Sequence, residues 1–229
     1  AGPNIVLNTI VAEAIDEIAS VLEGTSEDKF NEVLQGLLQD IIKKHKRVIF
    51  NGDNYSAAWA EEAEKRGLPN NRNTPEALKA LIADKNIALL EKYGVLTKTE
   101  VHSRYEVYTE EYATKIGIES SLALSMAKTM LIPVAVEYQK SLIDSILSMK
   151  EAGIEAGSAA LKAQATKIGD LLTAAFAACD KLSAAVEAED SAASIAAMLD
   201  LRAAIDVLEV EVDDDLWPLP KYGEMLFVY

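Results

Sequence analysis

Several residue types are scarce in this chain, and each shortage excludes a class of site. The 229 residues include a single cysteine, Cys179, so an intramolecular disulfide is excluded and a reducing, cytoplasmic setting is expected. The two histidines, His45 and His102, are far apart in the sequence and lie among charged residues. A histidine metal site needs ligands at a defined spacing, so we expect both to be ordinary surface residues.

Long apolar runs and basic residues are scarce as well. No stretch approaches the roughly 18 consecutive apolar residues of a membrane span. Lys and Arg together number 22 against 37 Asp and Glu, which gives a formal net charge of −15. Nucleic acids and anionic membranes are bound through a basic face, so we expect neither as a partner. A glycine-rich phosphate loop of the G-x-x-x-x-G-K type is also missing from the sequence.

The chain is rich in apolar residues at helical spacing. Half of its residues are hydrophobic, and they recur three or four positions apart, which predicts amphipathic helices. An independent domain usually begins with polar residues that fray, whereas here an apolar stripe starts almost at once. We therefore expect the first helix to need a partner surface and the chain to be a piece of a longer protein. The stripe consists of Leu7, Ile10, Val11, Ala14, Ile15, Ile18 and Val21.

Shorter helices joined by turns are predicted for the middle of the chain. The second helix is expected to be capped by Thr25 or Ser26 and to end in a basic run that suits the helix dipole. Residues 48–50 form the only convincing extended piece, and they run into a turn. A further helical stretch is expected from Thr74 to Lys92, with proline in its first turn.

The second half predicts long helices that pack together. Thr97 and Glu100 have the spacing of a capping box, and the helix that they start is expected to reach about Lys150, with a kink or break at Pro133. Apolar residues that alternate four and three apart then form a heptad seam, broken near residue 190. We predict antiparallel helices over about 120–150, 157–188 and 191–211. The seam residues are Leu161, Ala165, Ile168, Leu172, Ala175, Cys179, Leu182 and Val186, followed by Ile195, Met198, Leu201, Ile205, Leu208 and Val212.

The predicted fold is all-α, with a multi-helix body, a protruding antiparallel three-helix bundle of coiled-coil type and an irregular tail that contains prolines. We expect four parts: residues 1–47, 48–118, 119–212 and 213–229. The tail is too apolar to hang in water, so it is expected to fold back or to dock on a neighbour. Its candidate interface residues are Trp217, Leu219, Tyr222 and Phe227.

No set of residues points convincingly to catalysis or to a metal ion. Cys179 lies on the heptad seam, where a small core residue is expected rather than a nucleophile. The acidic run 213–215 is expected to be an exposed linker. Asn51, Asp53 and Asn54 could hold a cation or a phosphate, but a turn followed by a helix cap is the commoner explanation of this pattern. We therefore assign no catalytic, cofactor-binding or metal residue to this chain.

Several stretches of the sequence resemble the C-terminal third of type III glutamine synthetase, the large bacterial form. The likeness runs through almost the whole chain and is weakest in the alanine-rich part of the bundle. The residues that carry it are 2–4, 8–13, 48–56, 62–68, 74–78, 101–106 and 216–222. They include Val48-Ile49-Phe50-Asn51-Gly52-Asp53-Asn54 and Leu216-Trp217-Pro218-Leu219-Pro220.

The resemblance implies an enzyme that joins ammonia to glutamate with ATP and magnesium. In that family the metal ligands and phosphate-binding arginines lie on strands before the segment that residues 2–4 resemble, so no catalytic residue is carried over. It also implies that the partners are the catalytic domain of the same chain and further copies in a ring-shaped dodecamer. This chain would then be a structural and assembly region that is inactive alone.

Two other hypotheses remain open at this point. The chain could be a stand-alone helical protein-interaction module without enzymatic activity, whose gene begins near Ala1. It could instead hold a small ligand or nucleotide at residues 51–54 and in the loop 70–73.

Overall fold

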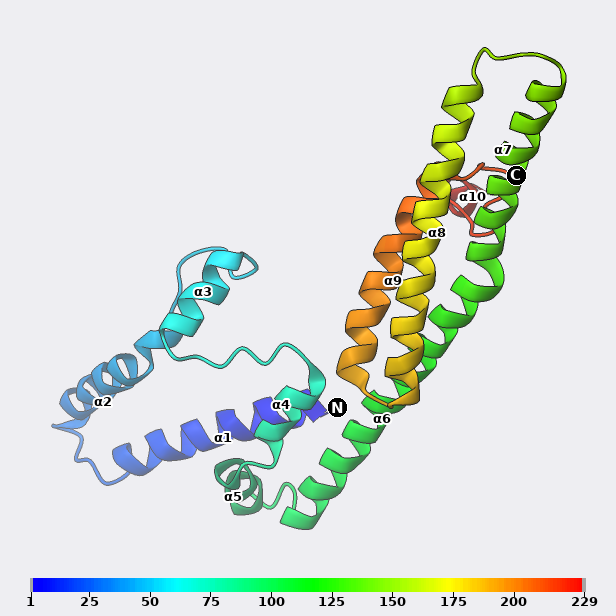
Figure 1. Cartoon of the computed structure of the whole chain (residues 1–229). Helices are drawn as coiled ribbons and strands as arrows, with labels where there is room; N and C mark the ends of the chain where they lie inside the picture. Colours follow the sequence, from blue (N-terminus) through cyan, green and yellow to red (C-terminus); the bar gives the residue numbers. More distant parts are fainter. Residues whose placement is uncertain (1, 228–229) are drawn as a thin grey trace. The chain divides into compact units, whose positions relative to one another are not determined.

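The computed structural model describes residues 2–227, so Ala1 and the last two tail residues, Val228 and Tyr229, lie outside the described part. All regular elements in residues 2–227 are helices, which confirms the predicted all-α class (Figure 1). The chain forms two compact units, Ala1–Glu110 and Glu111–Tyr229, and each is described by itself. The four expected parts stay a prediction, although the division after residue 118 falls close to the observed boundary.

Unit 1 is built from short helices. In order they are α1 (Gly2–Leu22), α2 (Phe30–His45), a 3₁₀ turn (Lys46–Val48), α3 (Ala57–Lys65), α4 (Thr74–Leu81), α5 (Asp84–Lys92) and the start of α6 (Lys98–Met126). Helix α1 contacts α2 and α5, and α4 contacts α5.

The buried core of unit 1 is small. Ile87, Leu90 and Val101 are its buried apolar residues, and Leu81, Ile82, Val95 and Leu96 pack against them. The predicted capping box fixes the start of α6: the Thr97 backbone N–H donates to Glu100 Oε2 at 2.8 Å, and the Glu100 N–H donates to Thr97 Oγ1 at 3.3 Å. These bonds satisfy two N–H groups that the first turn of a helix otherwise leaves unpaired.

Three local predictions for unit 1 were wrong in detail. Helix α2 begins at Phe30, because the Thr25 hydroxyl donates to the Val21 carbonyl and closes α1 instead of capping α2. The expected extended piece 48–50 is shorter, since Val48 ends the 3₁₀ turn and Ile49 has the extended backbone, with φ −85° and ψ 116°. The stretch 74–92 is two helices, because Ala83 is extended with ψ 134° and starts a new helix.

Unit 2 begins within α6. A π-helical turn (Ala127–Leu131) joins α6 to α7 (Ile132–Glu151), and α8 (Ser158–Glu187), α9 (Ser191–Glu211) and the short α10 (Tyr222–Leu226) follow. Pro133 lies in the first turn of α7. Proline has no N–H to donate, and the helix widens by one π turn just before it instead of breaking. Helices α7, α8 and α9 lie side by side in alternating directions, as predicted (Figure 1).

By length and composition alone, the continuous helix Lys98–Glu151 could cross a membrane, since it has 54 residues and a window with a mean hydropathy of 1.2. Core helices pass the same test, and Ala127, Leu131, Ile132 and Ala135 of this helix are buried in the bundle. The apolar window is 28% buried, so packing in the bundle covers part of its apolar surface.

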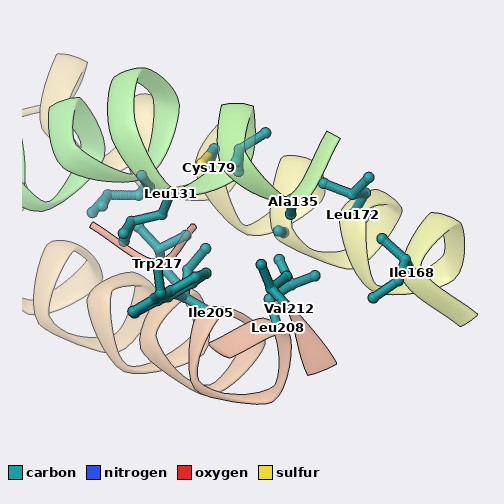
Figure 2. Packing of buried hydrophobic residues seen from close by; sticks show 14 of the residues in the cluster. Leu131, Ala135, Ile168, Leu172, Cys179, Ile205, Leu208, Val212 and Trp217 are labelled. Carbon is teal, nitrogen blue, oxygen red and sulfur yellow. The ribbon is translucent and has the colours of Figure 1, made fainter. Parts of the chain in front are cut away.

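The core of unit 2 follows the predicted heptad seam of α8. Its residues from Ala165 to Leu182 are buried, and Figure 2 shows several of them facing α7 and α9. On α9 the seam is shifted at one end: Ser194 and Ala197 are buried, while Ile195 and Met198 are half-buried. The connection between α8 and α9 is only three residues long there, so small side chains fit between closely spaced helices.

Candidate functional site

The turn at Asn51–Asn54 was the strongest candidate for a ligand site, and its bonds are those of a turn. Asp53 Oδ1 accepts a hydrogen bond from the Tyr55 backbone N–H at 2.9 Å. The Asp53 carbonyl accepts from the Ser56 hydroxyl at 2.7 Å. These local bonds lead the chain into α3, for which Ser56 is the N-cap residue. The Asp53 carboxylate is thus already engaged, and Asn54 is exposed.

A neighbouring aromatic ring lies where the side chain of any residue larger than Gly52 would begin. A Cβ atom at this position would lie 2.7 Å from the ring of Phe50, closer than real contacts allow. The Phe50 ring stacks on Trp59 of α3, with ring centroids 4.5 Å apart. The turn therefore holds the segment after α2 against α3.

Arg66, at the C-terminal end of α3, holds the same segment from the other side. Its Nη1 donates to the Ile49 carbonyl at 2.8 Å and to the Arg47 carbonyl at 3.3 Å. Its Nε donates to Glu62 at 2.7 Å, and its guanidinium carbon lies 5.8 Å from the centre of the Trp59 ring. Sequence reasoning missed this residue, because carbonyl partners 17 and 19 positions away leave no local pattern.

An open pocket of about 720 Å³ lies beside Arg66 and the segment that it binds. It is lined by Lys43 of α2, by Lys46 and Arg47 of the 3₁₀ turn, and by Arg66. Asn51 lines it too, so one residue of the predicted ligand turn belongs to a cavity, whereas Asp53 and Asn54 do not line it.

The loop at Asn70–Asn73 caps a helix. Asn73 Oδ1 accepts the Glu76 backbone N–H at 2.9 Å and is the N-cap residue of α4. Glu76 Oε2 in turn accepts the Arg72 N–H at 3.2 Å. The pocket beside Arg66 is not lined by this loop, so the structure does not bring the two halves of the predicted ligand site together there.

The remaining reactive side chains are dispersed. In residues 2–227 no group of three or more His, Cys, Asp and Glu side chains could hold a metal ion. Cys179 is fully buried on the α8 seam, and burial raises the pKa of its thiol, which keeps it protonated. His45 ends α2 on the surface, and the acidic run 213–215 is exposed.

The predicted interface residues of the tail separate into two groups. Trp217 is buried in the core of unit 2 between α9 and the helix that carries Leu131, and Leu219 packs against the same core (Figure 2). Tyr222 and Phe227 are exposed on the surface. Trp217 therefore fills the interior of its own unit, and the idea of an interface stays a prediction for the exposed residues.

Helix α1 leaves most of its apolar side chains exposed. Leu7, Val11 and Ile15 are 56%, 54% and 61% exposed. Thr9 is the buried residue of α1, and Asp16, seven positions later on the same helix face, is bound by α5. Unit 1 thus holds α1 by the face opposite the apolar stripe.

Comparison with known proteins now assigns the chain. The model of the glutamine synthetase C-terminal domain matches residues 33–150, which is more than half of the chain. This chain belongs to the glutamine synthetase C-terminal domain family.

Similar proteins agree with that assignment. A glutamine synthetase of Butyrivibrio fibrisolvens is 34% identical, over 90% of this chain and 31% of that protein. The type-3 glutamine synthetase of Dictyostelium discoideum is 33% identical over 99% of this chain and 33% of its own length, and the glutamine synthetase of Bacteroides fragilis is 30% identical over 99% and 34%. The chain thus spans about a third of the length of the curated relatives that it matches. The resemblance to type III glutamine synthetase is confirmed.

Sequence reasoning missed one further cluster in this chain. Tyr93 donates its hydroxyl hydrogen to Asp16 Oδ2 at 2.7 Å, and Lys92 Nζ lies 3.2 Å from the same oxygen. The residues are 76 and 77 positions from Asp16, so no motif could have linked them. The cluster ties α5 to α1.

Proposed function

We propose that this chain is the C-terminal helical region of a glutamate–ammonia ligase, and that it supports the catalytic part and its oligomeric assembly without supplying catalytic residues. Two facts support the proposal. The relatives named glutamine synthetase are about three times as long as the matched region. The matched family model is itself that of a C-terminal domain.

The observation that carries the supporting role is the exposed stripe of α1. Leu7, Val11 and Ile15 are more than half exposed, and they lie on the side that unit 1 does not use. Burying apolar surface is favourable by about 25 cal/mol for each Å² removed from water. We infer that the preceding, catalytic part of the longer enzyme covers this stripe.

The ATP and magnesium of the proposed reaction would bind elsewhere in that enzyme. Residues 2–227 do not fit a magnesium site, because no group of three or more acidic, histidine or cysteine side chains converges among them. We derive no catalytic step from this chain.

Assembly and location belong to the same proposal. Exposed apolar side chains of the tail, including Tyr222 and Leu226, suit contacts between copies in a ring assembly such as a dodecamer. We place the enzyme in the cytoplasm, with neither nucleic acid nor a membrane as a partner.

Activity assays test the proposal. The 229-residue chain should form no glutamine from ATP, glutamate and ammonia, whereas the same chain preceded by the remaining two-thirds of the enzyme should do so. Turnover by the 229-residue chain alone would exclude the supporting role.

A pair of variants tests the stripe itself. Val11→Lys with Ile15→Lys should lower the stability and activity of the longer enzyme, because two charges would enter a buried contact. The same pair should leave the 229-residue chain as stable as before, since both side chains are exposed in it. Ala12→Lys with Ser20→Lys, at two exposed positions outside the stripe, is the control matched in charge. Equal behaviour of the pair and the control in the longer enzyme would show that the stripe is not covered.

A further inference from the structure

Positive charge is concentrated at one place in unit 1, although the chain as a whole carries −15. Four cationic residues, Lys43, Lys46, Arg47 and Arg66, line the pocket of about 720 Å³, and none of its described lining residues carries a carboxylate. They come from three successive parts of the chain: α2, the 3₁₀ turn and the end of α3.

We propose that this pocket binds a small organic anion that carries at least two negative charges on a short aliphatic body. The shared chemistry is that of a polycarboxylate or a phosphate ester. The site depends only on unit 1, so it can be tested whether or not the proposed ligase function holds.

Arg66 gives the pocket a fixed donor. Its Nε and Nη1 are held by Glu62 and by the Ile49 and Arg47 carbonyls, and its side chain is 27% exposed. Its Nη2 has no hydrogen-bond partner in the described part of the chain. A guanidinium held in this way loses little conformational freedom when it binds an oxyanion.

Two further cationic side chains can bind an anion without the loss of an existing ion pair. Lys46 and Arg47 make no ion pair with residues 2–227, while Lys43 has a loose contact of 3.8 Å with Asp40. The Glu62 carboxylate and the negative ends of the α2 and α3 dipoles offset part of the charge. The four cations still exceed these negative groups, so an anion with two or more charges gains more than a singly charged one.

The uncharged residues that line the pocket indicate what the uncharged part of the ligand should be. Ile42 and Ile49 contribute aliphatic walls, and Asn51 can donate or accept a hydrogen bond. Phe50 and Trp59 stack on each other and do not line the pocket. No aromatic face among the lining residues is offered to a nucleobase, so a nucleotide should gain nothing from its base.

Calorimetric titration of the 229-residue chain with citrate, at constant ionic strength, tests the site. We expect saturable binding to one site at a ligand concentration of about 1 mM or below. The combined variant Lys43→Gln, Lys46→Gln and Arg47→Gln should bind about tenfold more weakly, because it removes three favourable charge contacts. All three side chains are exposed, so the variant should fold, which circular dichroism will check.

A second triple variant with the same change in charge is the control. Lys29→Gln, Lys44→Gln and Lys79→Gln lie in the same unit, are exposed and do not line the pocket. This variant should bind citrate within about twofold of the unchanged chain. Equal weakening in both triple variants, or no saturation with citrate or pyrophosphate at about 20 mM, would overturn the proposal.

Pyrophosphate and ATP complete the test. Tighter binding of pyrophosphate than citrate would assign the site to phosphate esters, and the reverse order would assign it to polycarboxylates. ATP should bind no more tightly than pyrophosphate. A clear gain from the adenosine part would contradict the aliphatic body that we propose.

Discussion

The Tyr93 hydroxyl donates a hydrogen bond of 2.7 Å to Asp16, and this bond joins two helices that are far apart in the sequence. Lys92 lies 3.2 Å from the same carboxylate oxygen and 4.7 Å from the centre of the Tyr93 ring. Thr9 is the buried residue of α1, and this exposed polar cluster is a second attachment of α1 to α5.

The attachment should weaken in acid. The hydrogen bond from Tyr93, followed by the contact with Lys92, lowers the pKa of Asp16 below its usual 3.8. A carboxylate with a lowered pKa in the folded state stabilises the fold above its unfolded-state pKa, and the contribution is lost as the pH falls through the lowered value. The thermal midpoint of the unchanged chain should therefore exceed that of Asp16→Asn at about pH 6, and the difference should close by about pH 2.

Tyr93→Phe is the companion test of the same bond. It removes the hydroxyl and keeps the ring, so α1 amides should exchange hydrogen faster while those of α8 and α9 stay unchanged. A pH-independent difference between the unchanged chain and Asp16→Asn, together with unchanged exchange in Tyr93→Phe, would show that α1 is held by other contacts.

The core of unit 2 predicts a large contrast between two leucines on α9. Leu208 is fully buried and Leu199 is 64% exposed. Leu208→Ala should lower the free energy of unfolding by about 2–5 kcal/mol, because it removes buried apolar surface and leaves a cavity. Leu199→Ala should change it by less than about 0.5 kcal/mol.

Urea denaturation can follow this unit selectively. Trp217 is buried in the same core as Leu208, and the other tryptophan, Trp59, belongs to unit 1. In a Trp59→Phe background, the fluorescence of Trp217 reports on unit 2. Similar losses for the two leucine variants would contradict the packing described for α9.

Two glycines should respond in opposite directions to the same substitution. Gly52→Ala places a methyl group 2.7 Å from the Phe50 ring and should displace it from Trp59, at a cost of about 1 kcal/mol. Gly36 lies inside α2 with nothing within 4 Å of its added Cβ, so Gly36→Ala should stabilise the helix by about 0.5–1 kcal/mol.

Near-ultraviolet circular dichroism of Trp59 and urea denaturation of unit 1 measure both effects. The aromatic signal should fall in Gly52→Ala and persist in Gly36→Ala. An unchanged signal in Gly52→Ala would mean that the Phe50 ring does not depend on this glycine.

The helical fold could be predicted because its signals are local. The Thr97–Glu100 capping box and the α8 seam from Leu161 to Val186 rest on spacings of three and four residues, and both were confirmed. The start of α2 and the break between α4 and α5 were not predicted. The Thr25 hydroxyl bonds back to Val21 instead of capping α2, and the extended backbone of Ala83 separates α4 from α5. The shift of the α9 seam to Ser194 depends on how closely two helices approach, which spacing alone does not give.

The candidate sites were harder to predict for a related reason. Asn51 was singled out as part of a turn, but the pocket that it lines is completed by Arg66 and by the basic end of α2. That basic run was interpreted only as a match to the helix dipole. Contacts such as those of Arg66 with Ile49 and of Asp16 with Tyr93 join distant positions, so a single sequence does not contain them.

The loop at 70–73 provides the last prediction, because a cap and a ligand site respond differently to substitution. Asn73 Oδ1 accepts the Glu76 N–H, so Asn73→Ala should destabilise the start of α4 by about 1 kcal/mol, while Asn73→Asp should keep the cap. Asn71 makes no hydrogen bond with the other described residues, so Asn71→Ala should have almost no effect. Hydrogen exchange of the amides in Thr74–Leu81 measures the opening of α4 directly. Faster exchange in Asn73→Ala alone would support the cap. Equal exchange in all three variants would show that Asn73 does not stabilise α4, and a ligand-binding role of the loop would again be the better explanation.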